Sequence, residues 1–228
     1  MINAAANYAR VREQVAAAAR RCGRRPEDIT IVCAAKTKGP ELIRAVLAAG
    51  ATDVGENYVQ EARQKIAQIH ESARWHLIGH LQRNKVKEAI SLFTLIHSLD
   101  SVALVQELHR QGEKQGKTVR ALIEVNLGGE QTKSGIAPNM VENLLAVAST
   151  LTFLRIEGFM TIPPPGPDAE AARSYFRALA RLREQYGRLR TESIDLRELS
   201  MGMTDDYLVA IEEGATIVRI GRAIFGER

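Results

Sequence analysis

Short apolar segments alternate with longer amphipathic segments along the whole chain, and no other feature restricts the fold as much. Eight segments have the length and β-branched composition of buried strands: residues 29–36, 53–57, 75–79, 92–98, 120–127, 154–162, 197–202 and 216–221. Segments with helical periodicity lie near 40–49, 57–70, 82–90, 101–116, 138–149, 168–188 and 204–213. Because parallel strands need crossovers of this size, the alternation predicts a parallel sheet covered by helices.

The number of strands favours one α/β architecture, the (β/α)8 TIM barrel. An open doubly wound sheet also alternates, but it seldom has eight evenly spaced units without a reversal of strand order. The length of 228 residues suits a barrel with an extra amphipathic helix within residues 1–25. We therefore expect residues 1–228 to form a single domain. The proline-rich segment 161–170 directly follows a strand, so we interpret it as a βα loop and not as a linker.

Composition excludes several classes of protein. No apolar run approaches the roughly 20 residues needed to span a bilayer, and the arginine-containing N-terminus resembles an amphipathic helix more than a secretory signal. Only two cysteines are present, Cys22 and Cys33, which are too few for a disulfide framework and match no metal spacing. These features predict a cytoplasmic protein.

The basic residues give little support for nucleic-acid binding. The net charge is +4 and the pI is about 9.2. The densest basic cluster has no interleaved aromatic residues for base stacking, and we interpret it as a solvated helix end; it comprises Arg20, Arg21, Arg24 and Arg25. A nucleic-acid interface on the arginine-rich helices, including Arg173, Arg177 and Arg181, remains an alternative.

The predicted strands end in residues with reactive or polar side chains. In TIM barrels, binding and catalytic residues come from the carboxyl ends of the strands. The residues found at or just after these ends, in strand order, are Lys36; Glu56 and Asn57; His80; His97 and Ser98; Glu124 and Asn126; Met160 and Thr161; Ser200; and Arg219 and Gly221. This concentration points to a ligand site at the mouth of the barrel.

Lys36 is the most unusual of these residues, because an apolar strand rarely ends in an ammonium group. Strand alternation places it on the same face as Val32 and Ala34. The small side chains of this face suit the barrel interior, whereas Cys33 and Ala35 face the helices. A lysine in a barrel mouth loses solvation, which lowers its pKa and makes it a nucleophile able to form Schiff bases. Taken alone, Lys36 is better explained as a strand-end lysine that reaches solvent.

The last two strands are followed by loops suited to an anion. The segments "SMGMTDD" (200–206) and "VRIGRAIFGER" (218–228) combine glycine with a following helix, and barrels often hold phosphate there. Tight turns would explain the same glycines equally well. Arg219 shares a face with Gly221, so both are predicted to point inward. A phosphate together with a Schiff-base lysine indicates either a sugar-phosphate aldolase or a pyridoxal 5′-phosphate (PLP) protein.

Seven stretches resemble one known family, the YggS/PROSC pyridoxal phosphate homeostasis proteins. They run in family order over nearly the whole chain: "AAKTK" (34–38), "GENYVQEA" (55–62), "WHLIGHLQRNK" (75–85), "IHSLD" (96–100), "GFMTIP" (158–163), "LSMGMTDDYLVAI" (199–211) and "GATIVRIGRAIFG" (214–226). The resemblance implies a fold-type III PLP barrel, like the N-terminal domain of alanine racemase. This agrees with the strand count, which was reached without it.

The resemblance also implies a set of cofactor contacts. Lys36 would form the covalent internal aldimine, and Arg219 would lie by the pyridine nitrogen and keep it unprotonated. The phosphate would be held by Ser200, Gly221 and the backbones of Met201 and Arg222, with Asn57, His80 and Met160 lining the ring. His80 has an equally simple structural interpretation, a helix-start histidine bonded to local backbone. Lys133, in the family's Lys-x-Gly feature, is interpreted as a solvated charge rather than a second lysine that receives PLP.

These features favour a carrier that stores or hands over PLP, supporting vitamin B6 and amino-acid homeostasis, without turnover. The chain ends seven residues after Gly221, which leaves no room for the second domain that completes alanine racemases. A weak PLP-dependent racemase is the alternative function, and a cofactor-free aldolase is a third. PLP-dependent apoenzymes are possible acceptors, no metal or catalytic residue is assigned, and a monomer is expected.

Overall fold

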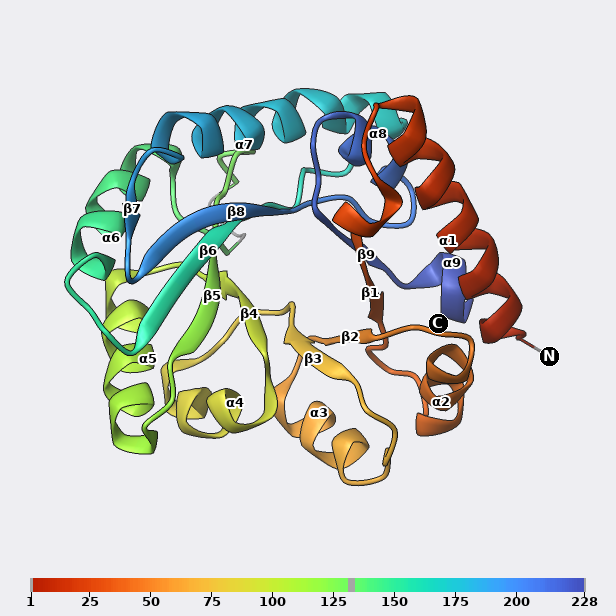
Figure 1. The fold of residues 1–228 in the computed structure, drawn as a ribbon, viewed down its shortest axis with the longest axis horizontal. Coiled ribbons are helices and arrows are strands. Elements are labelled where there is room, and N and C mark those ends of the chain that lie inside the picture. The colour runs from red at the N-terminus through yellow and green to blue at the C-terminus, as the bar shows by residue number, and fades with distance from the viewer. Residues whose placement is uncertain (1, 131–133, 228) are drawn as a thin grey trace.

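The strands close into a barrel of eight parallel strands, as the sequence predicts. The computed structural model describes residues 2–130 and 134–227. The barrel strands are β1 Thr30–Ala34, β2 Asp53–Glu56, β3 Arg74–Leu77, β4 Leu95–Leu99, β5 Val119–Glu124, β6 Leu154–Met160, β8 Ile194–Ser200 and β9 Ile217–Ile220. Each pairs with the next, β9 pairs with β1, and a β6–β8 pairing completes the ring (Figure 1). The two-residue β7, Arg190–Thr191, lies antiparallel to β8 and was not predicted.

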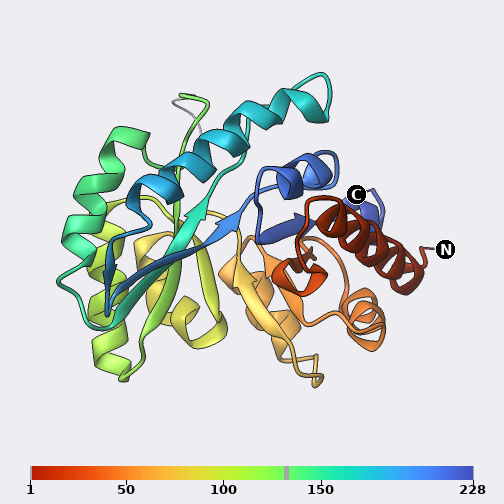
Figure 2. The ribbon, with the colours of Figure 1, turned by 45° about the horizontal axis from the view of Figure 1, so that its top comes forward.

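Helices surround the barrel, as Figures 1 and 2 show from two directions. They are α1 Ala4–Arg21, α2 Pro40–Ala48, α3 Val59–Ile66, α4 Val86–Leu92, α5 Val102–Gln115, α6 Val141–Ala148, α7 Arg173–Tyr186, α8 Tyr207–Glu212 and α9 Arg222–Phe225. The expected start signals operate: Pro40 occupies the first turn of α2, and the Ser101 hydroxyl accepts a hydrogen bond from the Leu104 N–H. The extra helix α1 packs against α8 and α9, so the N-terminal segment covers one side of the barrel.

Two apolar clusters confirm the face alternation on β1. A large cluster between strands and helices includes Cys33 and Ala35. A smaller, separate cluster fills part of the barrel interior; its members are Val32, Ala34, Ile78, Leu95, Leu122, Met160 and Ile217. The rest of the interior is polar, which is unusual because TIM-barrel cores are mostly filled with Val, Ile and Leu.

Several predicted boundaries were wrong. The strand predicted over 29–36 ends at Ala34, so Lys36 lies in a turn, where strand alternation no longer sets its direction. The strand predicted over 197–202 starts three residues earlier, at Ile194. The helices predicted over 82–90 and 168–188 each begin with a 3-10 turn, η2 Arg83–Lys85 and η4 Ala169–Ala172. Apolar periodicity identifies buried residues more reliably than it locates the first or last residue of a helix or strand.

The remaining compositional predictions concern membranes, cysteines and arginines. In the described part of the chain, every helix is too short or too polar to cross a bilayer. Cys22 and Cys33 are both free thiols, the first exposed and the second buried. Arg173 and Arg177 on α7 form ion pairs with nearby glutamates, Glu213 among them, so their charges are already compensated within the fold.

Candidate functional site

Lys36 occupies a constrained turn at the carboxyl end of β1. Its side chain is half-buried, and the next residue, Thr37, has a φ of 65°. Left-handed backbone is strained for a β-branched residue and needs surrounding support. Support comes from α3, where the Glu61 carboxylate accepts a hydrogen bond from the Thr37 N–H at 2.7 Å. The turn that carries Lys36 is therefore held by its neighbours.

A buried lysine on α3 stabilises the same turn. Lys65 Nζ donates to the Ala35 carbonyl at 2.8 Å, and to Glu56 Oε1 and Glu61 Oε1 at 2.7 Å each. Burial raises the pKa of Glu56 to about 7, against the opposing effect of Lys65. Sequence reasoning missed Lys65, although its place on the buried face of α3 beside Val59 and Ala62 was a usable signal.

Arg219 is a buried cation bonded only to neutral acceptors. Its side chain points into the barrel and is 3% exposed. Nη1 donates to Ser200 Oγ at 2.7 Å, and Nη2 donates to the Thr161 carbonyl at 3.0 Å. Burial lowers its pKa to about 10, an effect opposed by the more distant Glu124 and Asp206. Among the described residues no carboxylate forms an ion pair with Arg219, so the mouth retains uncompensated positive charge.

Glu124, the last residue of β5, also points into the mouth. It shares the inward face with Leu122, is 7% exposed and lines a cavity of about 220 Å³ with Asn57, His80 and Asn126. Within the described chain, its carboxylate has no hydrogen-bond or ion-pair partner. Burial and the nearby Asp100 raise its pKa to about 7, although Arg219 opposes this. Glu124 was noted as a strand-end residue but given no role; face alternation on β5 was the available signal.

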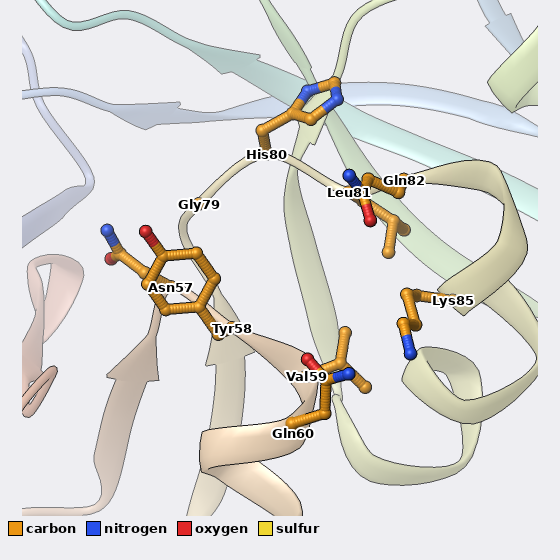
Figure 3. A pocket seen from close by; sticks show the side chains of 9 residues that line it. All are labelled: Asn57, Tyr58, Val59, Gln60, Gly79, His80, Leu81, Gln82 and Lys85. Atoms are coloured by element: carbon orange, nitrogen blue, oxygen red, sulfur yellow. The ribbon is translucent and has the colours of Figure 1, made fainter.

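A second cavity of about 240 Å³ adjoins the first and shares Asn57, Gly79 and His80 with it. Figure 3 shows His80 on one rim, Tyr58 beside Asn57, and Lys85 on the opposite side. His80 Nδ1 lies 3.1 Å from Asp100 Oδ2, so its partner is a side chain and not the local backbone. Asn57 and His80 are thus brought together at the mouth.

The predicted phosphate loops lie side by side, because β8 and β9 are paired. Gly221 opens α9, and a Cβ added to it would lie 3.3 Å from the Ala34 carbonyl. Arg222 forms an ion pair with Asp205. The Met201 N–H donates to the Ile217 carbonyl at 3.1 Å, so this backbone group already has a partner. The phosphate contacts remain a prediction.

Two further predicted residues differ in their surroundings. Met160, at the end of β6, is fully buried in the inner apolar cluster, directly below the mouth. Lys133 lies outside the described residues. The structure therefore assembles Lys36, Asn57, His80, Met160 and Arg219 at one end of the barrel, and adds Glu124 and Lys65 to the set.

Comparisons with known proteins agree with this architecture. The family model described as "Alanine racemase, N-terminal domain" matches residues 6–228. A pyridoxal phosphate homeostasis protein of Aquifex aeolicus is 42% identical over 228 residues, covering 100% of this chain and 99% of that protein. A protein of the same name from Escherichia coli K12 is 38% identical over 232 residues, with 100% and 98% coverage.

Solved structures give the same result. PipY of Synechococcus elongatus with PLP bound superimposes with a TM-score of 0.79 and 33% identity, covering 93% of this chain and 100% of PipY. A Bifidobacterium adolescentis protein of unknown function has a TM-score of 0.88 and 33% identity, covering 98% and 94%. Alanine racemase from Bartonella henselae shares the fold, with a TM-score of 0.74 and 15% identity over 98% of this chain and 58% of the racemase.

Proposed function

The chain belongs to the family of pyridoxal phosphate homeostasis proteins, and from this premise we propose that it binds PLP in the barrel mouth. Its function is to hold and buffer the cofactor, in support of vitamin B6 and amino-acid homeostasis. The PLP-bound structure of the relative PipY supports the identity of the ligand.

One observation carries the proposal: Arg219 is a buried cation whose two bonded acceptors are a hydroxyl and a carbonyl. A buried charge without a counter-ion is costly, so the mouth favours a ligand that brings negative charge or a lone pair. A phosphorylated pyridine supplies both. The residues present therefore fit PLP, with Arg219 by the ring nitrogen and Gly221 allowing close approach of the phosphate.

The proposed role of Lys36 is to anchor the ligand covalently. PLP carries an aldehyde that condenses with primary amines. Lys36 stands at the carboxyl end of β1 on a turn held by Glu61 and Lys65, so the backbone that carries its amine is fixed on both sides. Asn57 and His80 line the cavity that Glu124 also lines, and Met160 packs in the inner apolar cluster with Ile78 of the same cavity lining; all three are proposed to line the cofactor ring. Gly221 and the Arg222 backbone are proposed to form the phosphate end. The Ser200 hydroxyl and the Met201 N–H, also expected there, are already bonded, the first to His97 and Arg219 and the second to the Ile217 carbonyl.

A carrier needs an accessible cofactor, and the cavities beside Asn57 and His80 would give an incoming amine access to the mouth. We propose PLP-dependent apoenzymes as acceptors, a monomeric state and residence in the cytoplasm, with no role for nucleic acid. Racemisation is not proposed, because the alanine racemases share the fold at only 12–15% identity.

Absorbance spectroscopy tests the proposal directly. Purified protein titrated with PLP should develop a visible band, and borohydride should fix the cofactor irreversibly on Lys36, as located by mass spectrometry of peptides. The variant Lys36→Ala should lack both signals. Lys38→Ala is the matched control, since Lys38 is two residues away and donates instead to the Gly226 and Glu227 carbonyls. Protein that is colourless after excess unbound PLP has been removed by gel filtration would refute the proposal.

A separate assay decides between carrier and enzyme. The PLP-loaded protein should leave L-alanine unchanged when the product is analysed by chiral chromatography. Turnover that disappears in Lys36→Ala would instead establish the racemase function.

A further inference from the structure

A continuous chain of hydrogen bonds runs through the barrel interior and ends at Arg219. Asp53 Oδ1 lies 2.8 Å from His76 Nε2, and His76 Nδ1 lies 2.9 Å from His97 Nε2. His97 Nδ1 lies 2.8 Å from Ser200 Oγ, which accepts the 2.7 Å hydrogen bond from Arg219 Nη1. All five side chains are buried, between 0% and 5% exposed.

The chain connects the two ends of the barrel. Asp53 is the first residue of β2, whereas Ser200 is the last residue of β8. Between them, His76 and His97 come from β3 and β4. The two imidazole rings meet edge to face, with their centroids 5.2 Å apart. With Arg219 from β9, five strands thus contribute one side chain each to this chain of hydrogen bonds.

Donor and acceptor chemistry gives the chain a direction. The Asp53 carboxylate only accepts, so His76 Nε2 carries hydrogen. At the other end, Arg219 donates to Ser200 Oγ, so the Ser200 hydroxyl hydrogen goes to its remaining partner, His97 Nδ1. Burial lowers the pKa of His97 well below its usual value, and Arg219 acts in the same direction, so this ring is neutral; its hydrogen lies on Nε2, which donates to His76 Nδ1. Every hydrogen therefore points toward Asp53.

The direction of the chain fixes what Ser200 offers to Arg219. Its hydroxyl hydrogen is used by His97, so the oxygen presents its lone pairs to the guanidinium. Hydrogen bonds to Asp53 from His76, Arg74 and Thr52 outweigh the cost of burial and hold its pKa well below the usual value. The far end of the chain is therefore anchored by a permanent anion.

We propose that Asp53, His76, His97 and Ser200 are positioning residues that fix the Arg219 guanidinium for the cofactor ring. This role rests on the proposed function, since Arg219 is the residue assigned to the ring nitrogen. Its other bond, to the Thr161 carbonyl, leaves the guanidinium free to pivot without Ser200. Preorganisation of this kind matters because a charged group must be aimed before its ligand arrives.

The chain can be observed directly in the cofactor-free protein. The sequence has five histidines, so ¹⁵N-detected histidine NMR spectra can be assigned with single variants. His97 should carry hydrogen on Nε2 alone, and His76 should donate from Nε2 and accept at Nδ1. Detection of His97 with hydrogen on Nδ1, or of a charged His97, would mean a reversed or broken chain and would overturn the proposal.

Cofactor binding tests the positioning role. Asp53→Asn keeps an acceptor for His76 but removes the charge, and Ser200→Ala removes the link to Arg219. We expect the PLP dissociation constant to rise about threefold in Asp53→Asn and about tenfold in Ser200→Ala, the scale of one weakened or lost hydrogen bond. The ¹⁵N shift of ring-labelled PLP should move in both variants.

The control is Arg74→Gln. Arg74 bonds to Asp53 but is not part of the chain of hydrogen bonds that leads to Arg219, and its side chain is more than half exposed. It should retain the wild-type ring-nitrogen shift. A folded Asp53→Asn protein with wild-type affinity and an unchanged shift would overturn the proposal. If the wild type binds no PLP, the proposed function fails and the positioning role fails with it. The histidine tautomers would still show whether the chain of hydrogen bonds exists.

Discussion

The two ends of the barrel interior carry charge in different ways. At the amino-terminal end, Asp53 accepts hydrogen bonds from Arg74, His76 and Thr52, so both of its carboxylate oxygens have donors. At the mouth, Arg219 meets only neutral acceptors, and the Glu124 carboxylate has no partner in the described structure. One end is electrostatically complete and the other is not.

The difference separates stability from function. Compensated buried charge supports the fold, whereas uncompensated buried charge costs stability and persists where a ligand makes use of it. We therefore expect substitutions at the amino-terminal end mainly to weaken folding, with only a small effect on cofactor affinity through the hydrogen bonds from Asp53 to Arg219. Substitutions at the mouth should mainly weaken cofactor binding while sparing or improving folding.

Arg219→Met gives the largest expected effect and is the strongest test of the difference between the two ends of the barrel. Loss of the cation should raise the PLP dissociation constant about 100-fold, since charged hydrogen bonds are the strongest polar contacts. The cofactor-free protein should be at least as stable as wild type, because a buried uncompensated charge has been removed. Titration and urea unfolding measure the two quantities; a strongly destabilised variant would contradict the functional interpretation of Arg219.

Asp53→Ala tests the opposite end. It leaves His76 and Arg74 without their acceptor, and we expect the free energy of unfolding of the cofactor-free protein to fall by about 2 kcal/mol. Urea unfolding followed by circular dichroism measures this loss. Thr52→Val, which removes only one 2.7 Å bond to the same carboxylate, should cost less. Equal stability of Asp53→Ala and wild type would refute the assignment of this end to stability.

Glu124→Gln tests the charge at the mouth through the pH dependence of stability. Burial raises the pKa of Glu124 from 4.5 in the unfolded chain to about 7 in the fold. The folded state therefore holds a proton that the unfolded state has released, and stability falls as pH rises through this window. The loss should be about 2.5 kcal/mol between pH 4.5 and 7, because each unit of pKa difference corresponds to about 1.4 kcal/mol. Glu124→Gln should reduce the slope without abolishing it, because Glu56 is also raised to about 7. An unchanged slope would exclude Glu124 as its source.

Arg120→Ala should have the smallest effect. Arg120 forms an ion pair with Glu157 beside the amino-terminal opening, but it is half exposed. Exposed ion pairs contribute about 0.5 kcal/mol, so thermal unfolding and PLP affinity should both stay close to wild type. A large loss of stability would show that charge compensation at this end extends beyond the buried residues.

The fold followed from the sequence because apolar periodicity reports burial, and eight buried strands close only in certain ways. Lys36 and Arg219 were found for the same reason, as charges inside apolar periods. The chain through His76 and His97 was not predicted. Each histidine looked ordinary on its own strand, and only the barrel's closure brings β2, β3, β4, β8 and β9 to one axis.

The turn after β1 was misplaced for a different reason. Nothing in the local sequence indicates that Thr37 adopts a left-handed backbone, because threonine disfavours it. The conformation is imposed by Glu61 and Lys65, 24 and more residues further along the chain. Local propensity was overridden by a contact that only the tertiary fold creates.

Lys65 also has a consequence for chemical selectivity. Two primary amines, Lys36 and Lys65, serve the same turn, yet an aldehyde must react with only one. All three N–H bonds of Lys65 are directed at oxygen atoms of Ala35, Glu56 and Glu61, and its side chain is 8% exposed. An electrophile entering the mouth therefore finds Lys65 already engaged on every side. The hydrogen bonds of Lys65 thus have a chemical role besides a structural one, because they withhold this amine from an aldehyde.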